Sequence, residues 1–191
     1  QALQLPSISG KEGNMFLFEY SRINHESTKD IIDNIPLVRA ADFDICILSS
    51  SEKGFGYKRE IHIWITQNDY ANAYLMILMA YIIMGHPDWI KAEIKIFAIF
   101  PEEAATEQRE KLQQLALEGR LPISVNNIEV IYQEDIRTNK EIINDTSHLA
   151  DLTIIGYRIE ATKQIGTSLF DGFEELGNIV FVNASREKEI K

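Results

Sequence analysis

Hydrophobic and polar positions follow two different periods along this chain, and both become regular after residue 60. Residues 61–66, with the sequence IHIWIT, alternate between isoleucine and another side chain, which is the period of a β-strand. Segments with helical periodicity separate the later apolar runs, so the pattern predicts alternating strands and helices. Four such runs have the length and continuity of strands buried on both faces: residues 94–100, 128–132, 152–156 and 179–182.

Residues 70–84 predict a helix of unusual composition, because every side chain except Asn72 is apolar or aromatic. Asn68 or Asp69 is placed to cap its first turn, and residues 85–87 (GHP) end it. A helix without a polar face cannot lie on one side of a sheet with its outer side in water. The apolar run is well short of the about 20 residues that span a bilayer, so we expect no direct membrane insertion.

A second surface must therefore cover the outer side of this helix, and the sequence leaves two candidates open. One is a partner, either a second copy of the chain in a homodimer or another domain docked on the helix. The other is the chain's own N-terminal part, residues 1–57, folded back over the helix. The residues expected at an interface in the first case are Tyr74, Met76, Met79 and Ile83.

The remaining helices are shorter or amphipathic. Residues 101–118 open with proline and two glutamates, a favourable start for a helix with one apolar stripe. Thr138 and Glu141 have the spacing of a capping box at the start of the next helix. We also expect a short helix over residues 168–176, closed by Gly177. Before residue 60, the pattern predicts two strands and one short helix, over residues 14–20, 43–48 and 28–33.

Strands that alternate with helices are joined by right-handed crossovers and form a parallel sheet covered on both faces. The predicted fold class is therefore α/β, with three layers and a mostly parallel five-stranded sheet. Two strand orders are common for such sheets, 3-2-1-4-5 and 2-1-3-4-5, and we expect the first. One or two extra strands come from the N-terminal part. The expected division is an N-terminal segment over 1–57, an α/β domain over 58–185 and a charged tail over 186–191.

Composition narrows the classes of partner. The chain has 191 residues, a formal net charge of −10 and a pI near 4.9. Nucleic acid and anionic membrane surfaces both require a positive field, so neither is an expected partner. Cys46 is the single cysteine, which excludes a disulfide within the chain and agrees with a reducing compartment. The chain begins with Gln1 rather than methionine, so we expect a piece excised from a longer protein.

The expected ligand crevice lies at the switch point between the first and fourth strands of the core sheet, where the loops after these strands meet. The second of these loops runs from Gly156 to Ser168, where glycine permits close backbone approach while free N–H groups and hydroxyls face an anion. The alternative is a plain loop from strand to helix. The candidate phosphate or nucleotide site consists of Asn68, Asp69, Gly156, Gly166, Thr167 and Ser168.

The spacing of these glycines resembles the nucleotide loop of universal stress proteins. In that loop a strand-ending glycine, a second glycine, and a glycine followed by Ser or Thr together hold a phosphate chain. The second glycine of the pattern falls at Ile159 in this chain, and the Asp that usually ends the first strand is displaced to Asp69. The resemblance implies ATP or another adenine nucleotide as the candidate cofactor, and otherwise none is expected.

No catalytic constellation is visible in the sequence. The four histidines, His25, His62, His86 and His148, are scattered, and no pair has the spacing of metal ligands on a helix. No Gly-x-Ser-x-Gly motif surrounds the serines at positions 49–51. Because no nucleophile, base or metal cluster can be named, we predict a protein that is not an enzyme and holds no metal.

A longer resemblance covers residues 35–182. This part of the chain resembles the cytosolic C-terminal domain of prokaryotic cation-chloride cotransporters, which are relatives of amino acid permeases in the amino acid-polyamine-organocation superfamily. Residues 64–101 are the most specific part, because the apolar helix, the sequence Gly-His-Pro-Asp-Trp and the next strand occur together. The other matching stretches are IPLVRAADFDICIL (35–48), ADLTIIGY (150–157) and LGNIVFVNAS (176–185).

This resemblance implies a regulatory and assembly domain of a membrane transporter, with a fold similar to universal stress proteins and a tendency to dimerise. Such regions often contain two related α/β halves, and this chain holds one complete half plus an N-terminal segment. The expected location is the cytoplasmic side of the cell membrane, and the expected partners are a second copy and the parent transporter's transmembrane domain. A nucleotide-sensing module is the second function in view, and a small hydrolase or nucleotidyl-transfer enzyme is the third.

Overall fold

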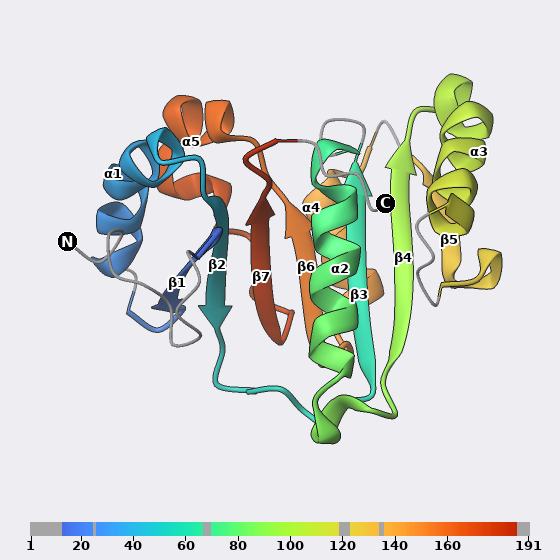
Figure 1. The fold of residues 1–191 in the computed structure, drawn as a ribbon, viewed down its shortest axis with the longest axis horizontal. Helices are drawn as coiled ribbons and strands as arrows, with labels where there is room; N and C mark the ends of the chain where they lie inside the picture. Colours follow the sequence, from blue (N-terminus) through green and yellow to red (C-terminus); the bar gives the residue numbers. More distant parts are fainter. Residues whose placement is uncertain (1–12, 25, 67–69, 119–122, 134–135, 187–191) are drawn as a thin grey trace.

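The computed structural model describes residues 13–24, 26–66, 70–118, 123–133 and 136–186. These residues form a seven-stranded sheet with helices on both faces (Figure 1). The order across the sheet is β1-β2-β7-β6-β3-β4-β5. No helix among the described residues has the length and apolar character needed to cross a membrane. The strands are β1 (Met15–Ser21), β2 (Asp44–Ser50), β3 (Glu60–Thr66), β4 (Glu93–Phe100), β5 (Ile128–Tyr132), β6 (Leu152–Gly156) and β7 (Asn178–Asn183).

The five later strands form the parallel core, and their order β5-β4-β3-β6-β7 is the predicted order 3-2-1-4-5. β3 lies inside this core, where Trp64 pairs with Phe97 of β4 on one side and with Ile155 of β6 on the other. The isoleucines of β3 contribute to one hydrophobic core and Trp64 to another. The period of two that is visible in the sequence therefore separates the two faces of the sheet.

The N-terminal part of the chain adds two strands to the same sheet, as expected. β1, helix α1 (Glu26–Ala40) and β2 form a βαβ unit whose two strands are parallel to each other. β2 then pairs antiparallel with β7, with Cys46 opposite Val182. Residues 13–24 and 26–57 therefore extend the β7 edge of the sheet, and Figure 1 shows them beside the apolar helix rather than over it.

Helix α1 is longer than the short helix predicted over residues 28–33. Its buried face consists of Ile31, Ile35 and Val38, which recur at three or four residues. These side chains pack on the same core as the inward residues of β1 and β2. Pro36 lies inside the helix, and the polar residues around this stripe hid its period. Tertiary packing rather than local propensity stabilises α1.

The other helices divide between the two faces. Helix α2 (Ala73–Met84), which follows the 3₁₀ turn η2 (Tyr70–Asn72), shares one core with α3 (Glu102–Glu118). Helices α1 and α4 (Asn139–Ser147) share the other. The predicted capping box at α4 is confirmed, since Thr138 N donates to Glu141 Oε2 at 2.7 Å and Glu141 N donates to Thr138 Oγ1 at 3.3 Å. The remaining elements are η3 (Pro87–Trp89), η4 (Val125–Asn127), α5 (Ile159–Ile165) and η5 (Gly166–Leu169).

Two local predictions at the last crossover are wrong. The segment from Gly156 to Ser168 is not a loop, because α5 occupies its middle, and residues 168–176 form no α-helix. Gly166 ends α5 with a φ of 58°, a conformation that suits glycine. After η5, residues 170–177 are irregular. Basic side chains from three other elements bind the carbonyl groups of residues 168–177, in place of helical N–H groups: Arg22, Lys53 and Lys140.

Asp151 fixes the connection between β2 and β3. Its Oδ1 accepts a hydrogen bond from Tyr57 N at 2.7 Å, and its Oδ2 accepts from Arg59 N at 2.6 Å and from Glu60 N at 2.9 Å. Gly56 is required beside it, because a Cβ there would lie 2.1 Å from Asp151 Oδ1. A single buried carboxylate thus positions the start of the central strand.

We expect Asp151→Ala to lower the free energy of unfolding by about 2–3 kcal/mol, because three N–H groups lose a charged acceptor. Urea unfolding followed by circular dichroism measures the change. The matched control is Asp145→Ala, which removes an exposed ion pair with Arg137 and should change stability by less than about 1 kcal/mol. Equal effects of the two substitutions would contradict the anchoring role of Asp151.

Candidate functional site

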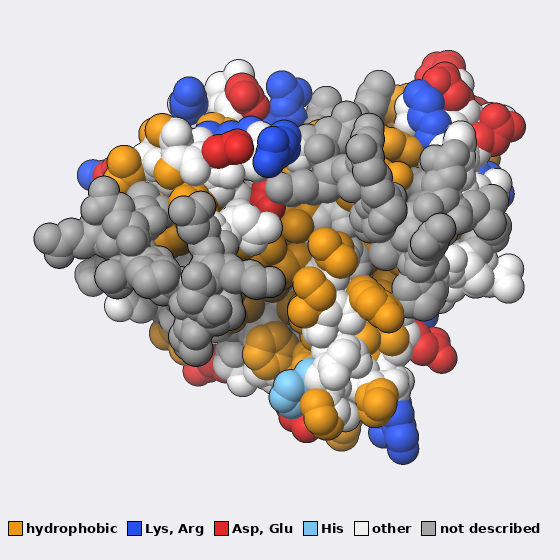
Figure 2. Space-filling model, viewed as in Figure 1, with side chains coloured by type: hydrophobic (Ala, Val, Ile, Leu, Met, Phe, Trp, Pro, Cys, Tyr) orange, Lys and Arg blue, Asp and Glu red, His pale blue; other side chains and the backbone are white. Residues whose placement is uncertain are grey.

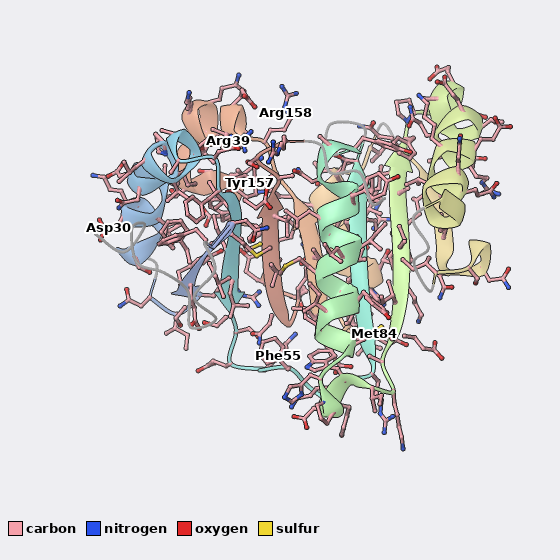
Figure 3. All side chains as sticks on the ribbon, in the orientation of Figure 1. Asp30, Arg39, Phe55, Met84, Tyr157 and Arg158 are labelled. Atoms are coloured by element: carbon pink, nitrogen blue, oxygen red, sulfur yellow. The ribbon has the colours of Figure 1, made fainter. Side chains whose placement is uncertain are left out.

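The carboxyl ends of β3 and β6 meet at the predicted switch point, and the structure has a hollow of ≈ 330 Å³ there. Thr66 and Gly156, the last residues of the two strands, form part of its wall. Arg158 and Glu160, at the start of α5, form another part. In Figure 3, Tyr157 and Arg158 lie together at this end of the sheet. The position agrees with the crevice expected for this strand order.

The chain's own amide groups hold the strand ends together beside this hollow. The carbonyl oxygen of Tyr157 accepts hydrogen bonds from Asn72 Nδ2 at 3.1 Å and from Asn183 Nδ2 at 2.8 Å. Asn72 Oδ1 in turn accepts from Ala184 N at 2.8 Å, and Arg39 Nη1 donates to the Ala184 carbonyl at 3.0 Å. Asn72 is the N-cap residue of α2, yet its side chain makes no cap bond and links β6 to β7 instead.

Asn68 and Asp69, two of the six predicted phosphate-site residues, lie outside the described residues. Of the other four, Gly156 lines the hollow, and residues 166–168 do not, although Gln164 and Leu169 on either side of them do. The Ser168 carbonyl accepts a hydrogen bond from Lys140 Nζ at 2.9 Å, which ties this segment to α4. Phosphate binding at these residues stays a prediction.

The charges at the hollow are nearly balanced. Arg158 Nε lies 3.6 Å from Glu160 Oε2, and both side chains are more than half exposed. Burial raises the pKa of Tyr157, so its phenol stays protonated and neutral. Neither histidine nor cysteine is among the lining residues, and no group of three potential metal ligands occurs in the described part of the chain. The hollow therefore offers a ligand one cation, Arg158, and one carboxylate, Glu160, beside neutral polar groups.

The outer side of α2 is the second candidate. Its inner side, with Met76, Ile77 and Ala80, is fully buried against the sheet. On the outer side Tyr81 is 49% exposed and Ile82 is 61% exposed, and Figure 2 shows apolar side chains gathered over this helix. We call the outward residues Leu78, Tyr81 and Ile82 the α2 stripe.

None of the four predicted interface residues belongs to this stripe. Tyr74, Met79 and Ile83 lie at its sides and are partly exposed, whereas Met76 faces the sheet and is fully buried, so it cannot contact a partner of the folded chain. No polar residue within α2 marks the phase of the helix, so its outward side could not be read from the sequence.

Apolar side chains continue beyond the end of α2. Ile90 is exposed just after η3, and Phe55 packs edge-on against Trp89 with ring centroids 5.9 Å apart. Figure 3 places Phe55 and Met84 at the same end of the molecule. The exposed apolar surface is therefore larger than the α2 stripe alone.

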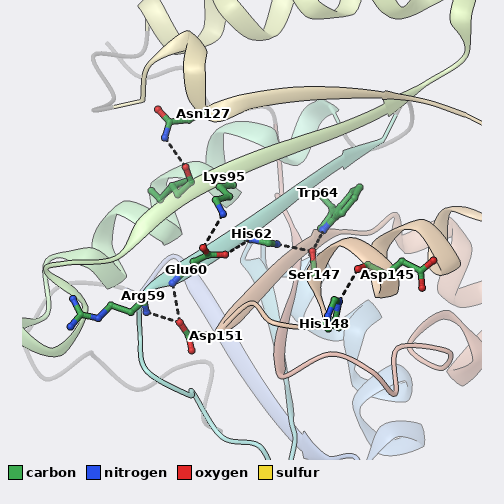
Figure 4. A network of polar contacts seen from close by, with 11 residues as sticks. Arg59, Glu60, His62, Trp64, Lys95, Asn127, Asp145, Ser147, His148 and Asp151 are labelled. Atoms are coloured by element: carbon green, nitrogen blue, oxygen red, sulfur yellow. Dashed lines mark hydrogen bonds and ion pairs between the residues drawn. The ribbon is translucent and has the colours of Figure 1, made fainter.

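A polar network on the opposite face of the sheet was not predicted from the sequence (Figure 4). It connects Ser147, His62 and Glu60 in the order of a hydrolase triad. Ser147 is fully buried, however, and its Oγ also bonds to Trp64, so no substrate can reach this hydroxyl. The network is therefore a structural element of the core and not a nucleophilic site.

The fold has solved relatives in two groups. The first is the cytoplasmic domain of a prokaryotic cation chloride cotransporter, with a TM-score of 0.66, 19% sequence identity, and coverage of 93% of this chain and 66% of that one. The second includes a universal stress protein from Archaeoglobus fulgidus, with a TM-score of 0.51 and 12% identity, covering 90% of this chain and 61% of that one. A Pseudomonas aeruginosa protein of the same description has a TM-score of 0.50 and 17% identity, covering 86% and 62%.

These likenesses establish the fold. It is the predicted α/β architecture of the universal stress protein type, extended by two N-terminal strands, and it occurs in a cation chloride cotransporter's cytoplasmic domain. The chain spans about two thirds of the length of each neighbour. No known protein-family profile and no curated protein matches the chain.

Asn72 provides a test of how the strand ends are held. We expect Asn72→Ala to lower the free energy of unfolding by about 1–3 kcal/mol, because it leaves the buried N–H of Ala184 without an acceptor. Thermal and urea unfolding measure this. Asn34→Ala is the control, since Asn34 Nδ2 bonds only within an exposed turn of α1, to Asp30 O, and should be nearly neutral. A neutral Asn72→Ala would show that the two strand ends do not depend on this amide.

Proposed function

We propose that this chain is a non-enzymatic cytosolic regulatory and assembly domain of a membrane transporter of the cation-chloride cotransporter type. It would act through dimerisation and through contacts with other domains of the parent protein, on the cytoplasmic side of the membrane. The observation that carries the proposal is the exposed α2 stripe, on a helix that has no polar residue in Ala73–Met84. The likeness to a cotransporter's cytoplasmic domain supports it at the level of fold.

Charge favours the α2 stripe over other surfaces for contact between two copies. Each chain has a formal net charge of −10, so two copies repel each other over most of their surfaces. The twelve residues of α2 contain no charged side chain. A two-fold contact would bring this uncharged helix against its own copy, which buries apolar area on both sides without opposing carboxylates.

Cation-chloride cotransporters belong to the amino acid-polyamine-organocation superfamily, which also includes the amino acid permeases. The parent protein would therefore be a membrane transporter of this superfamily. Its transmembrane domain is the second proposed partner. The exposed side chains of Phe55 and Ile90, next to the end of α2, extend the apolar surface beyond the α2 stripe. The absence of an accessible nucleophile at the described sites supports a role in contacts rather than in catalysis.

We expect Ile82→Glu to shift the purified chain from dimer to monomer, raising the dissociation constant at least about tenfold, because a buried charge would oppose its copy at the interface. Sedimentation velocity over a concentration series measures the change. Ile136→Glu is the matched control, because Ile136 is 94% exposed and lies shortly before α4, which packs on the other face of the sheet from α2. Ile136→Glu should keep the unfolding temperature of the unsubstituted chain, and Ile82→Glu should unfold at the temperature that the unsubstituted chain shows when it is diluted to monomer. If the unsubstituted chain is monomeric even at high concentration, dimerisation through this stripe is contradicted.

A nucleotide-sensing module is the second candidate, favoured by the hollow of ≈ 330 Å³ at the switch point. Adenine nucleotides would then occupy the space between Thr66, Gly156 and Arg158, with Arg158 facing the phosphates. Against this stands the pairing of Arg158 with Glu160, which reduces the positive field that a triphosphate requires.

Calorimetric titration with ATP, ADP and AMP distinguishes the two candidates. We expect no saturable heat, because the field at the hollow is neutralised. Saturable binding that disappears in Arg158→Glu, but persists in the control Lys163→Glu on the exposed last turn of α5, would establish the nucleotide module instead. Gly166→Val is unsuitable as a test variant, since the φ of 58° at this position strains any β-branched residue.

A further inference from the structure

A chain of polar side chains passes through the core between β3, β4 and α4 (Figure 4). Trp64 Nε1 lies 2.8 Å from Ser147 Oγ, which lies 2.8 Å from His62 Nδ1. His62 Nε2 lies 3.1 Å from Glu60 Oε2, and Lys95 Nζ lies 2.9 Å from Glu60 Oε1. Trp64 and Ser147 are fully buried and His62 is 4% exposed, so bulk water cannot replace a lost partner there.

Chemistry fixes the direction of each hydrogen bond in this network. An indole N–H only donates, so Ser147 Oγ accepts from Trp64. An ionised carboxylate only accepts, so Nε2 of His62 carries a proton and donates it to Glu60. Nδ1 of the neutral ring is then an acceptor for the Ser147 hydroxyl. With His62 neutral, each of these donors has an acceptor, and one tautomer alone achieves this.

Protonation of His62 disrupts this match. Nδ1 becomes a second donor facing Ser147 Oγ, and the Ser147 hydroxyl proton loses its acceptor. We propose that the network is a proton switch, in which proton uptake at Nδ1 of His62 reverses the bond to Ser147 and loosens the C-terminal turn of α4. The switch is a property of the domain itself and does not depend on the proposed transporter role.

Charged groups from three elements surround the His62 ring: Glu60 on β3, Lys95 on β4 and Asp151 before β6, while the ring of Phe97 packs against it with centroids 4.9 Å apart. Burial lowers the pKa of His62 most strongly, and Lys95 acts in the same direction, whereas Glu60 and Asp151 oppose it. The hydrogen bond from Lys95 lowers the pKa of Glu60. Glu60 is therefore mostly ionised at any pH above the ordinary carboxyl value of 4.5.

The sign of the pH dependence follows from these directions. The pKa of His62 is about 6.5 in the unfolded chain and lower in the folded chain, so the folded state binds fewer protons in this range. Its contribution to stability is therefore complete above about pH 6.5 and is lost as the pH falls through the folded pKa. Glu60, on the Nε2 side of the ring, links the network to solvent, since its side chain is 37% exposed and lines a separate hollow with Asp151.

The position of Ser147 explains how the switch reaches other parts of the chain. Ser147 is the last residue of α4, and Asp151, four residues later, holds the N–H groups before β3. At the other end of α4, Lys140 Nζ binds the carbonyl groups of Ser168 and Asp171. Loosening the last turn of α4 therefore alters the hydrogen bonds by which Asp151 holds the β2–β3 connection and Lys140 holds residues 168–177.

The test is an NMR titration of the intact chain from about pH 8 to about pH 5 with ¹⁵N-labelled histidine and tryptophan. We expect the Nε2–H tautomer of His62 at the alkaline end. On acidification His62 should take up a proton with a midpoint below about 6.5, and the Trp64 indole N–H resonance should shift with the same midpoint. His62→Gln should abolish the Trp64 transition. Glu60→Gln should lower its midpoint, because it removes the anion that favours the charged ring.

His148→Gln is the matched control, because His148 follows Ser147 in sequence but is exposed and bonds to the Asp145 carbonyl at 2.8 Å. This variant should leave the Trp64 transition unchanged, and the far-UV circular dichroism should stay constant over the titration in all variants. The switch is excluded if Trp64 does not respond while His62 titrates, or if the transition persists in His62→Gln. A loss of far-UV circular dichroism at the same midpoint would show general acid unfolding and would also overturn the proposal.

Discussion

Helix α2 contains no charged side chain, so both its inner and its outer side need apolar cover. The inner side packs on the parallel core, in which β3 is a central strand. Burial of apolar surface contributes about 25 cal/mol per Å². Tyr81 and Ile82, which are about half exposed, lack much of this stabilisation in the isolated chain. The proposed contact between two copies would bury this surface on both helices.

Much of the fold could be predicted because the strands are short, apolar and regularly spaced. Runs such as residues 61–66 reveal their period locally, and the crossover rules then order the strands. The prediction failed where local sequence and tertiary packing disagree. Helix α5 was missed because it has only seven residues and follows a glycine, and its few apolar positions give no clear period. Helix α1 was shortened because polar residues and Pro36 mask its buried stripe.

The candidate sites were less predictable, since they depend on contacts between residues distant in sequence. Asp151 binds N–H groups more than ninety positions earlier, and Ser147 meets His62 across 85 positions. No sequence motif marks either contact. The topology rule located the hollow at the switch point correctly, but it could not show that Asn72 would bridge the neighbouring strand ends. The phase of α2 was also hidden, because no polar residue marks its outer side.

β3 lies between the helix that carries the proposed interface, α2, and the helix that shares the proposed switch, α4. Ile61, Ile63 and Ile65 contact the core beneath α2, whereas His62 and Trp64 face α4. Apolar side chains at the positions of His62, Trp64 and Ser147 would fill the same space and would avoid the cost of burying polar groups. The polar network therefore adds a property that packing alone does not supply, which is sensitivity to one proton. If β3 shifts its register or tilts, the side chains on both of its faces move together, because they share one backbone. A proton at His62 and a partner at α2 would then act on the same element from opposite sides of the sheet.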